Sequence, residues 1–408
     1  MAAKMGKKEA AHECISEDAL VHLKSYRYSS VDKSYLSRYV LKHYWNGFVE
    51  LLPLWLAPNM VTLLGFFAIL VNVGLLQNFD PGLTGEKGPR WLYYSYAAGV
   101  WAYSTMDNVD GKQARRTGTS SGLGELFDHG IDSLNCTLAS LLEASAMGLG
   151  TTKTGIFTAL IPTLPMFFST WETYHTHTLY LGYFNGPTEG LLLATILMLV
   201  SGYYGAGIWR APLSSLLGFE SILGKLSMVD VWVPLILFSF FAAHLPDCMV
   251  NVIKARRAKN LPISSIFVEW TPMVIFIGSL MLWLGSPESH ILSNNHVTLL
   301  CLTLSFVFGR MTTKIILAHL TRQPFPKFTM MLVPLMGGAA LTNLRFFGYE
   351  PIGPQTERLY LWGCLIVSAV VYFRWAVLVI DAICSYLGIN CLTIPREKWE
   401  AAKRAKSS

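Results

Sequence analysis

The stretch D-N-V-D-G-K-Q-A-R-R-T-G-T-S-S-G-L-G-E-L-F-D-H-G-I-D, residues 107–132, decides the fold, and we call it the motif. A helix that ends near Gly111 and another that begins near Phe127 each gather polar side chains on one face, since successive helical residues are rotated by about 100°. On the first helix, a sector of about 140° holds Asp107, Asp110, Gly111, Ala114 and Arg115. On the second helix, a sector of about 100° holds Glu125, Asp128, His129 and Asp132. Two facing helices are therefore predicted to bring four aspartates together, with Glu125 beside them.

These aspartates adjoin strongly apolar stretches, where four uncompensated carboxylates cost about 10 to 14 kcal/mol. A bound cation offsets this cost, and hard oxygen ligands with no cysteine and at most one histidine suit Mg²⁺, Mn²⁺ or Ca²⁺. Four carboxylates can hold two metal ions that clamp a phosphoryl group. We expect two Mg²⁺ or Mn²⁺ ions, held by Asp107, Asp110, Asp128 and Asp132.

The residues between the aspartates favour a phosphate ligand. Gly111 and Ala114 leave room for a bulky ligand beside the backbone, and Arg115 can bind phosphate through two parallel hydrogen bonds. In the alternative, the aspartates cap helix ends and pair with Lys112, Arg115 and Arg116, which leaves the second pair of aspartates unexplained.

The composition excludes an ordinary soluble domain, because 52% of the residues are hydrophobic, 14% are charged and the mean hydropathy is +0.40. The chain is predicted to be an all-α polytopic membrane protein with about ten transmembrane helices. The expected spans are 58–79, 91–110, 127–149, 154–176, 188–209, 229–253, 263–285, 296–319, 326–345 and 357–387.

The distribution of Lys and Arg predicts the orientation. Of 32 such residues, 22 lie in segments on the side of the N-terminus, so the positive-inside rule puts both termini and the motif in the cytosol. The net charge of +6 thus reflects topology and gives no indication of nucleic acid binding.

Four regions follow from this reading. Residues 1–57 form a cytosolic segment in which 34–52 are expected to form an amphipathic helix at the membrane interface; a soluble helix packed on the bundle is the alternative. Spans 1–6 at 58–253 form the catalytic core, 254–387 carry spans 7–10, and 388–408 are a basic cytosolic tail.

The pattern D107-x2-D110-G111-x2-A114-R115-x8-G124-x3-D128-x3-D132 resembles the complete signature of the CDP-alcohol phosphotransferase family. The variant DGKQARRT with LGELFDHGIDS, and the stretches 53–62 and 171–181, resemble the eukaryotic choline/ethanolamine branch, in particular its fungal members. This resemblance implies transfer of phosphocholine or phosphoethanolamine from CDP-choline or CDP-ethanolamine to diacylglycerol, giving phosphatidylcholine or phosphatidylethanolamine and CMP. It also implies a homodimer in the endoplasmic reticulum membrane, with the Golgi as the alternative.

The resemblance adds substrate contacts at Asn59, Thr62 and Gly124, although Asn59 and Thr62 also suit a helix N-terminus, where capping explains them equally well. For the base, the family points to Asp132. His129 competes because it titrates nearer neutrality and lies one turn from Glu125, with which it can form a relay. We favour His129 as the base. In the alternative, this histidine only forms a hydrogen bond with a neighbouring carboxylate.

Aromatic and acidic residues at the end of the fourth span can hold a quaternary ammonium group, although an interfacial aromatic belt explains the aromatic ones nearly as well. These residues are Trp171, Glu172, Tyr174, His175 and His177. The pattern does not show whether the head group is choline or ethanolamine. Two other functions remain as alternatives: a phosphatidyltransferase that uses CDP-diacylglycerol and a divalent cation transporter.

Overall fold

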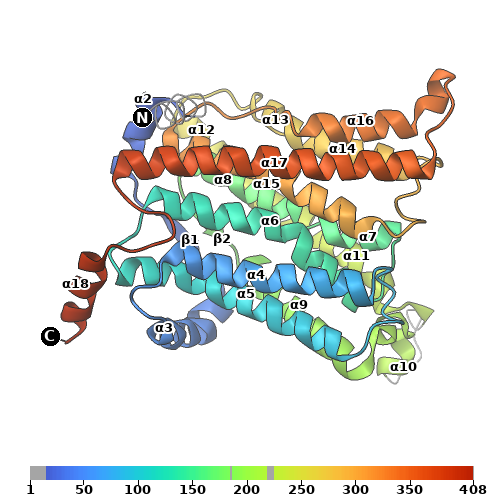
Figure 1. Cartoon of the computed structure of the whole chain (residues 1–408), viewed down its shortest axis with the longest axis horizontal. Helices are drawn as coiled ribbons and strands as arrows, with labels where there is room; N and C mark the ends of the chain where they lie inside the picture. Colours follow the sequence, from blue (N-terminus) through green and yellow to red (C-terminus); the bar gives the residue numbers. More distant parts are fainter. Residues whose placement is uncertain (1–14, 184–185, 218–224, 408) are drawn as a thin grey trace.

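The computed structural model describes residues 15–183, 186–217 and 225–407, which form a bundle of long helices lying side by side (Figure 1). The longest are α4 (Pro58–Phe79), α5 (Trp91–Arg116), α6 (Gly122–Ala146), α15 (Val297–Thr321) and α17 (Pro354–Leu387). The others of eight residues or more are α3 (Lys42–Leu51), α7 (Lys153–Leu160), α8 (Thr163–Thr176), α9 (Leu191–Tyr204), α11 (Met228–Ser239), α12 (Leu245–Ala258), α14 (Thr271–Gly285), α16 (Leu332–Thr342) and α18 (Arg396–Ser407).

Within the described ranges, four helical stretches are long and apolar enough to cross a membrane: Pro58–Phe79, Met228–Ala258, Val297–Thr321 and Pro354–Leu387. Each of the ten predicted segments contains a helix, but several are shorter than predicted. The predicted segment 154–176 is divided into α7 and α8 at Pro162, because a proline has no N–H with which to continue the hydrogen bonds of the preceding helix. The chain is thus a mostly helical protein of the membrane.

The described structure also contains a small sheet, which the all-α prediction omitted. Strand β1 (Ser30–Asp32) pairs in parallel with β2 (Leu179–Leu181), so the N-terminal segment is tied to the chain that leaves α8. The parallel pairing joins residues far apart in the sequence. Strands of three residues are too short to show the alternation of polar and apolar residues that predicts a strand.

A helix forms in the N-terminal region, but its packed face differs from the predicted one. The π-turn η2 (Ser37–Leu41) leads into α3, whose residues Trp45 and Val49 are buried against Val61 and Val109. The apolar residues on which the interfacial prediction rests include Val40, Tyr44 and Phe48, each one position before a buried residue, and Leu51, which is 78% exposed. The helix therefore has apolar residues on both its packed and its exposed side.

Helix α4 packs closely on α5, the helix that carries the first part of the motif. A side chain at Gly99 would clash with Asn72 of α4, whose amide donates to the carbonyl oxygen of Ser95 at 3.1 Å. Ser95 Oγ donates back to Asn72 Oδ1 at 2.7 Å. Small residues let two helices approach each other closely within a membrane. Here the polar side chain between the helices, Asn72, both donates and accepts a hydrogen bond. These contacts hold the first half of α5, which precedes the motif, against α4.

The motif helices begin and end at other residues than predicted. Helix α5 continues past Gly111 to Arg116, and the chain then turns at Gly118, whose φ of +64° suits glycine. Helix α6 begins at Gly122, where the Ser121 hydroxyl accepts a hydrogen bond from the Gly124 N–H at 3.3 Å. The acidic residues of the motif and His129 are thus all helical, so the polar face of each helix is continuous.

Candidate active site

The four aspartates of the motif lie on two neighbouring helices, as the sequence predicted. Asp107 and Asp110 belong to α5, and Asp128 and Asp132 belong to α6. Each carboxylate interacts electrostatically with others of the four. Two of them accept hydrogen bonds from hydroxyl groups: Thr62 of α4 donates to Asp110, and Tyr103 of α5 donates to Asp132. These hydroxyls orient one carboxylate on each helix.

The other two aspartates fit a bound cation. Asp107 Oδ1 and Asp128 Oδ1 are buried, and no group among the described residues forms a hydrogen bond with them. Within the same ranges, no Lys, Arg or His forms an ion pair with any of the four carboxylates. A buried carboxylate without a partner is costly unless a cation compensates it. The donor set is mainly oxygen, which suits Mg²⁺ or Mn²⁺.

His129 lies at the edge of this cluster. One ligand atom each from Asp128, His129 and Asp132 lie within 4.8 Å of one another. His129 therefore lies close enough either to share a metal ion or to exchange a proton with a group bound at the carboxylates.

The three cations that follow the first aspartate pair have different surroundings. Arg116 donates to the carbonyl oxygens of Val49 at 2.6 Å and Leu52 at 2.9 Å, and Lys112 donates to Asn46 at 2.8 Å. These two side chains hold α3 against α5. Arg115 is exposed and forms no ion pair within the described ranges, so the alternative in which the aspartates pair with these cations is wrong in this structure.

The small residues of the motif border open space. A side chain at Gly111 would meet only Arg115 Nη1, at 3.5 Å, and one at Gly124 would meet only Asn59 Oδ1 and Ser121 Oγ, both at 4.0 Å. Asn59 at the start of α4 thus lies beside Gly124 at the start of α6. Its amide donates to the Cys391 carbonyl oxygen at 3.0 Å, which brings the segment after α17 to the same place.

Among the candidate substrate contacts, the structure brings Asn59 and Thr62 of α4 to the motif, although both are distant from it in sequence: Asn59 lies beside Gly124 and Thr62 beside Asp110. Thr62 contacts Asp110 directly, so it is an orienting residue for a carboxylate as well as a residue of the first helical turns. Ala114 is partly buried on α5 between Gly111 and the exposed Arg115.

Glu125 has partners that the sequence did not indicate. It accepts a hydrogen bond from Tyr26 of the N-terminal segment, and its Oε1 lies 3.7 Å from His319 Nε2 of α15. Burial, with the Glu125 charge beside it, raises the pKa of Tyr26 well above its usual range, so Tyr26 acts as a donor. Among the described residues, no hydrogen bond joins Glu125 to His129. A relay between them therefore requires Glu125 to form a hydrogen bond with His129 in addition to its contacts with Tyr26 and His319.

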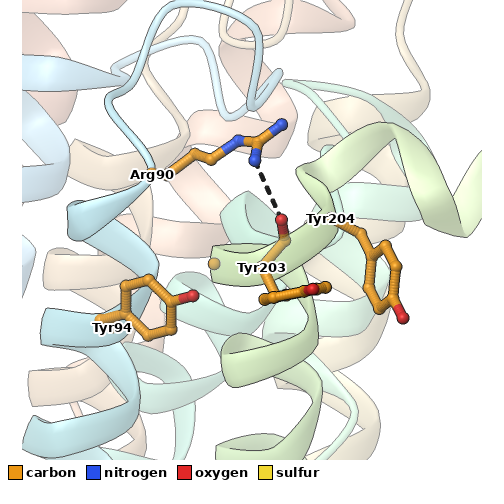
Figure 2. A pocket seen from close by; sticks show the side chains of 5 residues that line it. Arg90, Tyr94, Tyr203 and Tyr204 are labelled. Carbon is orange, nitrogen blue, oxygen red and sulfur yellow. Dashed lines mark hydrogen bonds between the residues drawn. The ribbon is translucent and has the colours of Figure 1, made fainter.

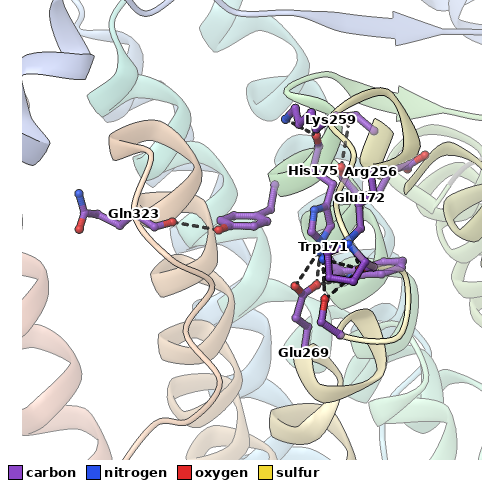
Figure 3. A network of polar contacts seen from close by, with 11 residues as sticks. Trp171, Glu172, His175, Arg256, Lys259, Glu269 and Gln323 are labelled. Carbon is purple, nitrogen blue, oxygen red and sulfur yellow. Dashed lines mark hydrogen bonds and ion pairs between the residues drawn. The ribbon is translucent and has the colours of Figure 1, made fainter. Parts of the chain in front are cut away.

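The residues considered for the head group lie in a network of buried polar contacts (Figure 3). Glu269 accepts hydrogen bonds from Trp171 Nε1 at 2.7 Å and from Arg256 at 3.2 Å, and it lies 2.7 Å from His175 Nε2. Glu172 accepts from Asn251 at 2.6 Å. These contacts join α8, α12 and the turn α13 (Ile266–Glu269). Since the acids already have protein partners, the network favours a structural role over recognition of an ammonium group.

An open pocket lies at the opposite end of α5. Figure 2 shows Arg90 before the first turn of α5, donating to the Tyr203 carbonyl oxygen at 3.0 Å, with Tyr94 and Tyr204 nearby. Asp107 lies about 24 Å further along the helix at a rise of about 1.5 Å per residue. This pocket is therefore separate from the motif.

Comparison with known proteins places the motif within a matched region. The family model described as CDP-alcohol phosphatidyltransferase matches residues 55–214. The chain is 35% identical to choline/ethanolaminephosphotransferase 2 of Arabidopsis thaliana, over 94% of this chain and 99% of the relative. It is 36% identical to choline/ethanolaminephosphotransferase 1 of Saccharomyces cerevisiae, over 79% and 83%. It is 37% identical to cholinephosphotransferase 1 of the same yeast, over 76% and 80%.

Proposed function

The chain belongs to the CDP-alcohol phosphatidyltransferase family, and we propose that it is an enzyme that transfers phosphocholine or phosphoethanolamine from the CDP-alcohol to diacylglycerol, releasing CMP. One observation carries the proposal: the complete motif gathers four aspartates on two neighbouring helices, two of them, Asp107 and Asp128, have a buried oxygen without a hydrogen-bond partner among the described residues, and the exposed Arg115 follows on the first helix. A nucleotide diphosphate with its metal ions is the ligand that meets both needs. The relatives compared above are named for this reaction.

Asp107, Asp110, Asp128 and Asp132 are the proposed ligands of two Mg²⁺ or Mn²⁺ ions. When bound, these ions supply positive charge that neutralises the diphosphate and the charge that develops on the leaving CMP. Thr62 and Tyr103 keep two of the carboxylates in fixed directions through their hydrogen bonds. Tyr103 is only 2% exposed, so water has little access to replace the hydrogen bond that its hydroxyl donates to Asp132.

The nucleotide lies, in this proposal, against the small residues near the end of α5 and at the start of α6. Gly111, Ala114 and Gly124 provide the space, and Arg115 binds a phosphate oxygen. Asn59 contributes its amide group beside Gly124.

The hydroxyl oxygen of diacylglycerol attacks the phosphorus that bears the head group, and the bond from this phosphorus to the CMP oxygen breaks. His129 takes the hydroxyl proton, with Glu125 one helical turn before it as support; Asp132 is the alternative base. Because Asp132 also lies among the metal ligands and accepts a hydrogen bond from Tyr103, we favour His129 for this step.

For the chain in the membrane, we propose ten spans with both termini and the motif in the cytosol, α3 at the membrane interface, and the endoplasmic reticulum as the location. The Golgi is the alternative compartment. Residues 58–253 form the catalytic core, 254–387 the C-terminal spans, and 388–408 a cytosolic tail after the segment 1–57. The exposed Leu51 on α3 supports the interfacial placement. A homodimer is part of the same proposal.

Release of CMP by the purified protein in detergent tests the reaction. With diacylglycerol and Mg²⁺ or Mn²⁺, we expect turnover of CDP-choline or CDP-ethanolamine, and the ratio of the two ranks the head groups. Turnover only of CDP-diacylglycerol with a soluble alcohol would favour the other phosphatidyltransferase reaction. No turnover of any donor by folded protein, together with metal uptake into vesicles, would favour a cation transporter.

Replacing Arg115 by Ala should raise the KM for the CDP-alcohol about 10- to 100-fold with a smaller change in kcat, because a charge-assisted contact to phosphate is lost. Arg116→Ala is the matched comparison: it should lower the melting temperature, because Arg116 holds the end of α3. Steady-state kinetics and thermal unfolding of both variants distinguish the two roles. An unchanged KM in Arg115→Ala would exclude the phosphate contact.

A further inference from the structure

We propose that Tyr26 is a positioning residue of the active site: its hydroxyl fixes the carboxylate of Glu125 for the reaction. This inference rests on the proposed function and extends it to a part of the chain outside the motif and the matched region. Tyr26 donates a hydrogen bond to Glu125 Oε2 across 99 positions of sequence. The Glu125 side chain is only 6% exposed, so water has little access to replace this donor.

The backbone around Tyr26 is anchored on the motif helix. At Gly122, an added side chain would lie 3.2 Å from Leu23 Cδ2 and 3.5 Å from Tyr26 Cγ, so the glycine allows both residues to pack on the first turn of α6. Leu23 belongs to a buried apolar cluster that joins the N-terminal segment to α6, α15 and α17. The members of this cluster are Ile15, Leu20, Leu23, Leu123, Leu126, Ile316, Leu317, Leu320, Trp375, Val379 and Ile383.

The segment is held on the other side of Tyr26 as well. Strand β1 begins four residues later and pairs with β2 in register Ser30 to Leu179. Tyr26 therefore lies between two attachments to the bundle, and its hydroxyl has a defined place. An unattached N-terminal segment would not hold the hydroxyl in one place, since ordering the segment in each catalytic cycle would cost conformational entropy.

A second group approaches Glu125 from the opposite direction. His319 Nε2 lies 3.7 Å from Glu125 Oε1, while its Nδ1 lies 3.0 Å from Nδ1 of His177, on which its ring is stacked. Each oxygen of Glu125 thus faces a group from another element. A carboxylate has about four acceptor positions, so these contacts leave room for a bond to His129, one turn along α6.

This arrangement explains why a tyrosine is useful here. A glutamate side chain has several rotatable bonds and loses entropy when it is held in one conformation. Tyr26 holds it in the structure before substrate binds, so the support that Glu125 gives to the neighbouring histidine is available without rearrangement. Within the described ranges, the Tyr26 hydroxyl forms a hydrogen bond with Glu125 and none with the four aspartates, so we infer that it acts through Glu125.

The test is Tyr26→Phe, which removes the hydroxyl and keeps the ring on Gly122. We expect kcat to fall about 10- to 100-fold, with the KM for the CDP-alcohol and the melting temperature unchanged. In a Glu125→Gln background the same substitution should change kcat by less than about threefold, because the group that it positions is no longer a carboxylate. A merely structural tyrosine would give additive losses and a lower melting temperature.

Tyr360→Phe is the matched control, since the Tyr360 hydroxyl also donates a hydrogen bond, to Pro334 O at 2.7 Å, far from the motif on α17. It should leave kcat unchanged. Full activity in Tyr26→Phe, or a loss that persists in the Glu125→Gln background, would overturn the positioning role while wild-type turnover still supports the proposed function. Absence of wild-type turnover with every CDP-alcohol would overturn both.

Discussion

Replacing Asp128 by Asn should reduce metal-dependent release of CMP about a thousandfold, which corresponds to roughly 4 kcal/mol of transition-state stabilisation. Asp128 Oδ1 is buried, and within the described ranges it has no hydrogen-bond partner, while Asp107, Asp110 and Asp132 surround it with negative charge. Asparagine has the same size but no charge, so a divalent ion loses one of its anionic ligands. The negative charge that develops on the leaving CMP would then be less well neutralised.

Thermal unfolding separates this loss from misfolding. Without metal, Asp128→Asn should be at least as stable as the wild type, because the substitution removes an uncompensated buried charge. Added Mg²⁺ or Mn²⁺ should stabilise the wild type more than the variant, since a ligand stabilises the state that binds it. Asp18→Asn, at an exposed carboxylate of the short helix α2 (Glu17–Leu20), is the control and should change neither property. Wild-type activity in Asp128→Asn would contradict the metal assignment.

The sequence predicted the parts of the site that are local in the chain. The spacing of the four aspartates is a helical periodicity within 26 residues. The signals that end α5 at Gly118 and begin α6 at Ser121 are also local, but the predicted bounds near Gly111 and Phe127 overlooked them. Helix α4 has the predicted bounds 58–79 because an apolar run lies between Pro58 and Asp80. Such features depend on neighbouring residues, and a single sequence contains them.

Contacts between distant segments were not predicted. Tyr103 belongs to the apolar part of α5 and looks like a core aromatic residue until α6 brings Asp132 to its hydroxyl. Tyr26 lies in a polar segment in which only a few apolar residues, Leu20 and Leu23 among them, indicate packing. His319 is one histidine near the end of a buried helix. No pattern in one sequence pairs these residues with their carboxylates; the signal would be covariation between the positions.

The residues at the end of α8 show how one sequence pattern can suit two roles. Aromatic and acidic side chains near a membrane boundary suit an ammonium ligand, but the same types also satisfy one another. Glu269 and Arg256, which lie far along the chain, supply the partners of Trp171 and His175. Because buried charges require partners, a buried acid beside an arginine is better explained by folding than by a ligand.

Replacing His129 by Gln should lower kcat about 10²- to 10⁴-fold while the KM for the CDP-alcohol and the metal requirement stay the same. Glutamine keeps a polar group at the edge of the carboxylate cluster but cannot take a proton from the diacylglycerol hydroxyl at neutral pH. The hydroxyl is too weakly acidic to ionise alone, so the attack on phosphorus becomes slow. Single-turnover measurements of CMP formation at saturating metal check this, with His43→Gln, an exposed histidine of α3, as the control.

The same variant distinguishes the two roles that the geometry permits. His129 lies within 4.8 Å of the ligand atoms of Asp128 and Asp132, so it can be a metal ligand as well as a base. If it binds metal, His129→Gln raises the metal concentration required for half-maximal activity, and saturating metal restores kcat. If it is the base, no metal concentration restores turnover. Unchanged kcat and metal dependence would assign the proton to Asp132, and the hydrogen bond from Tyr103 would then hold the base itself in place.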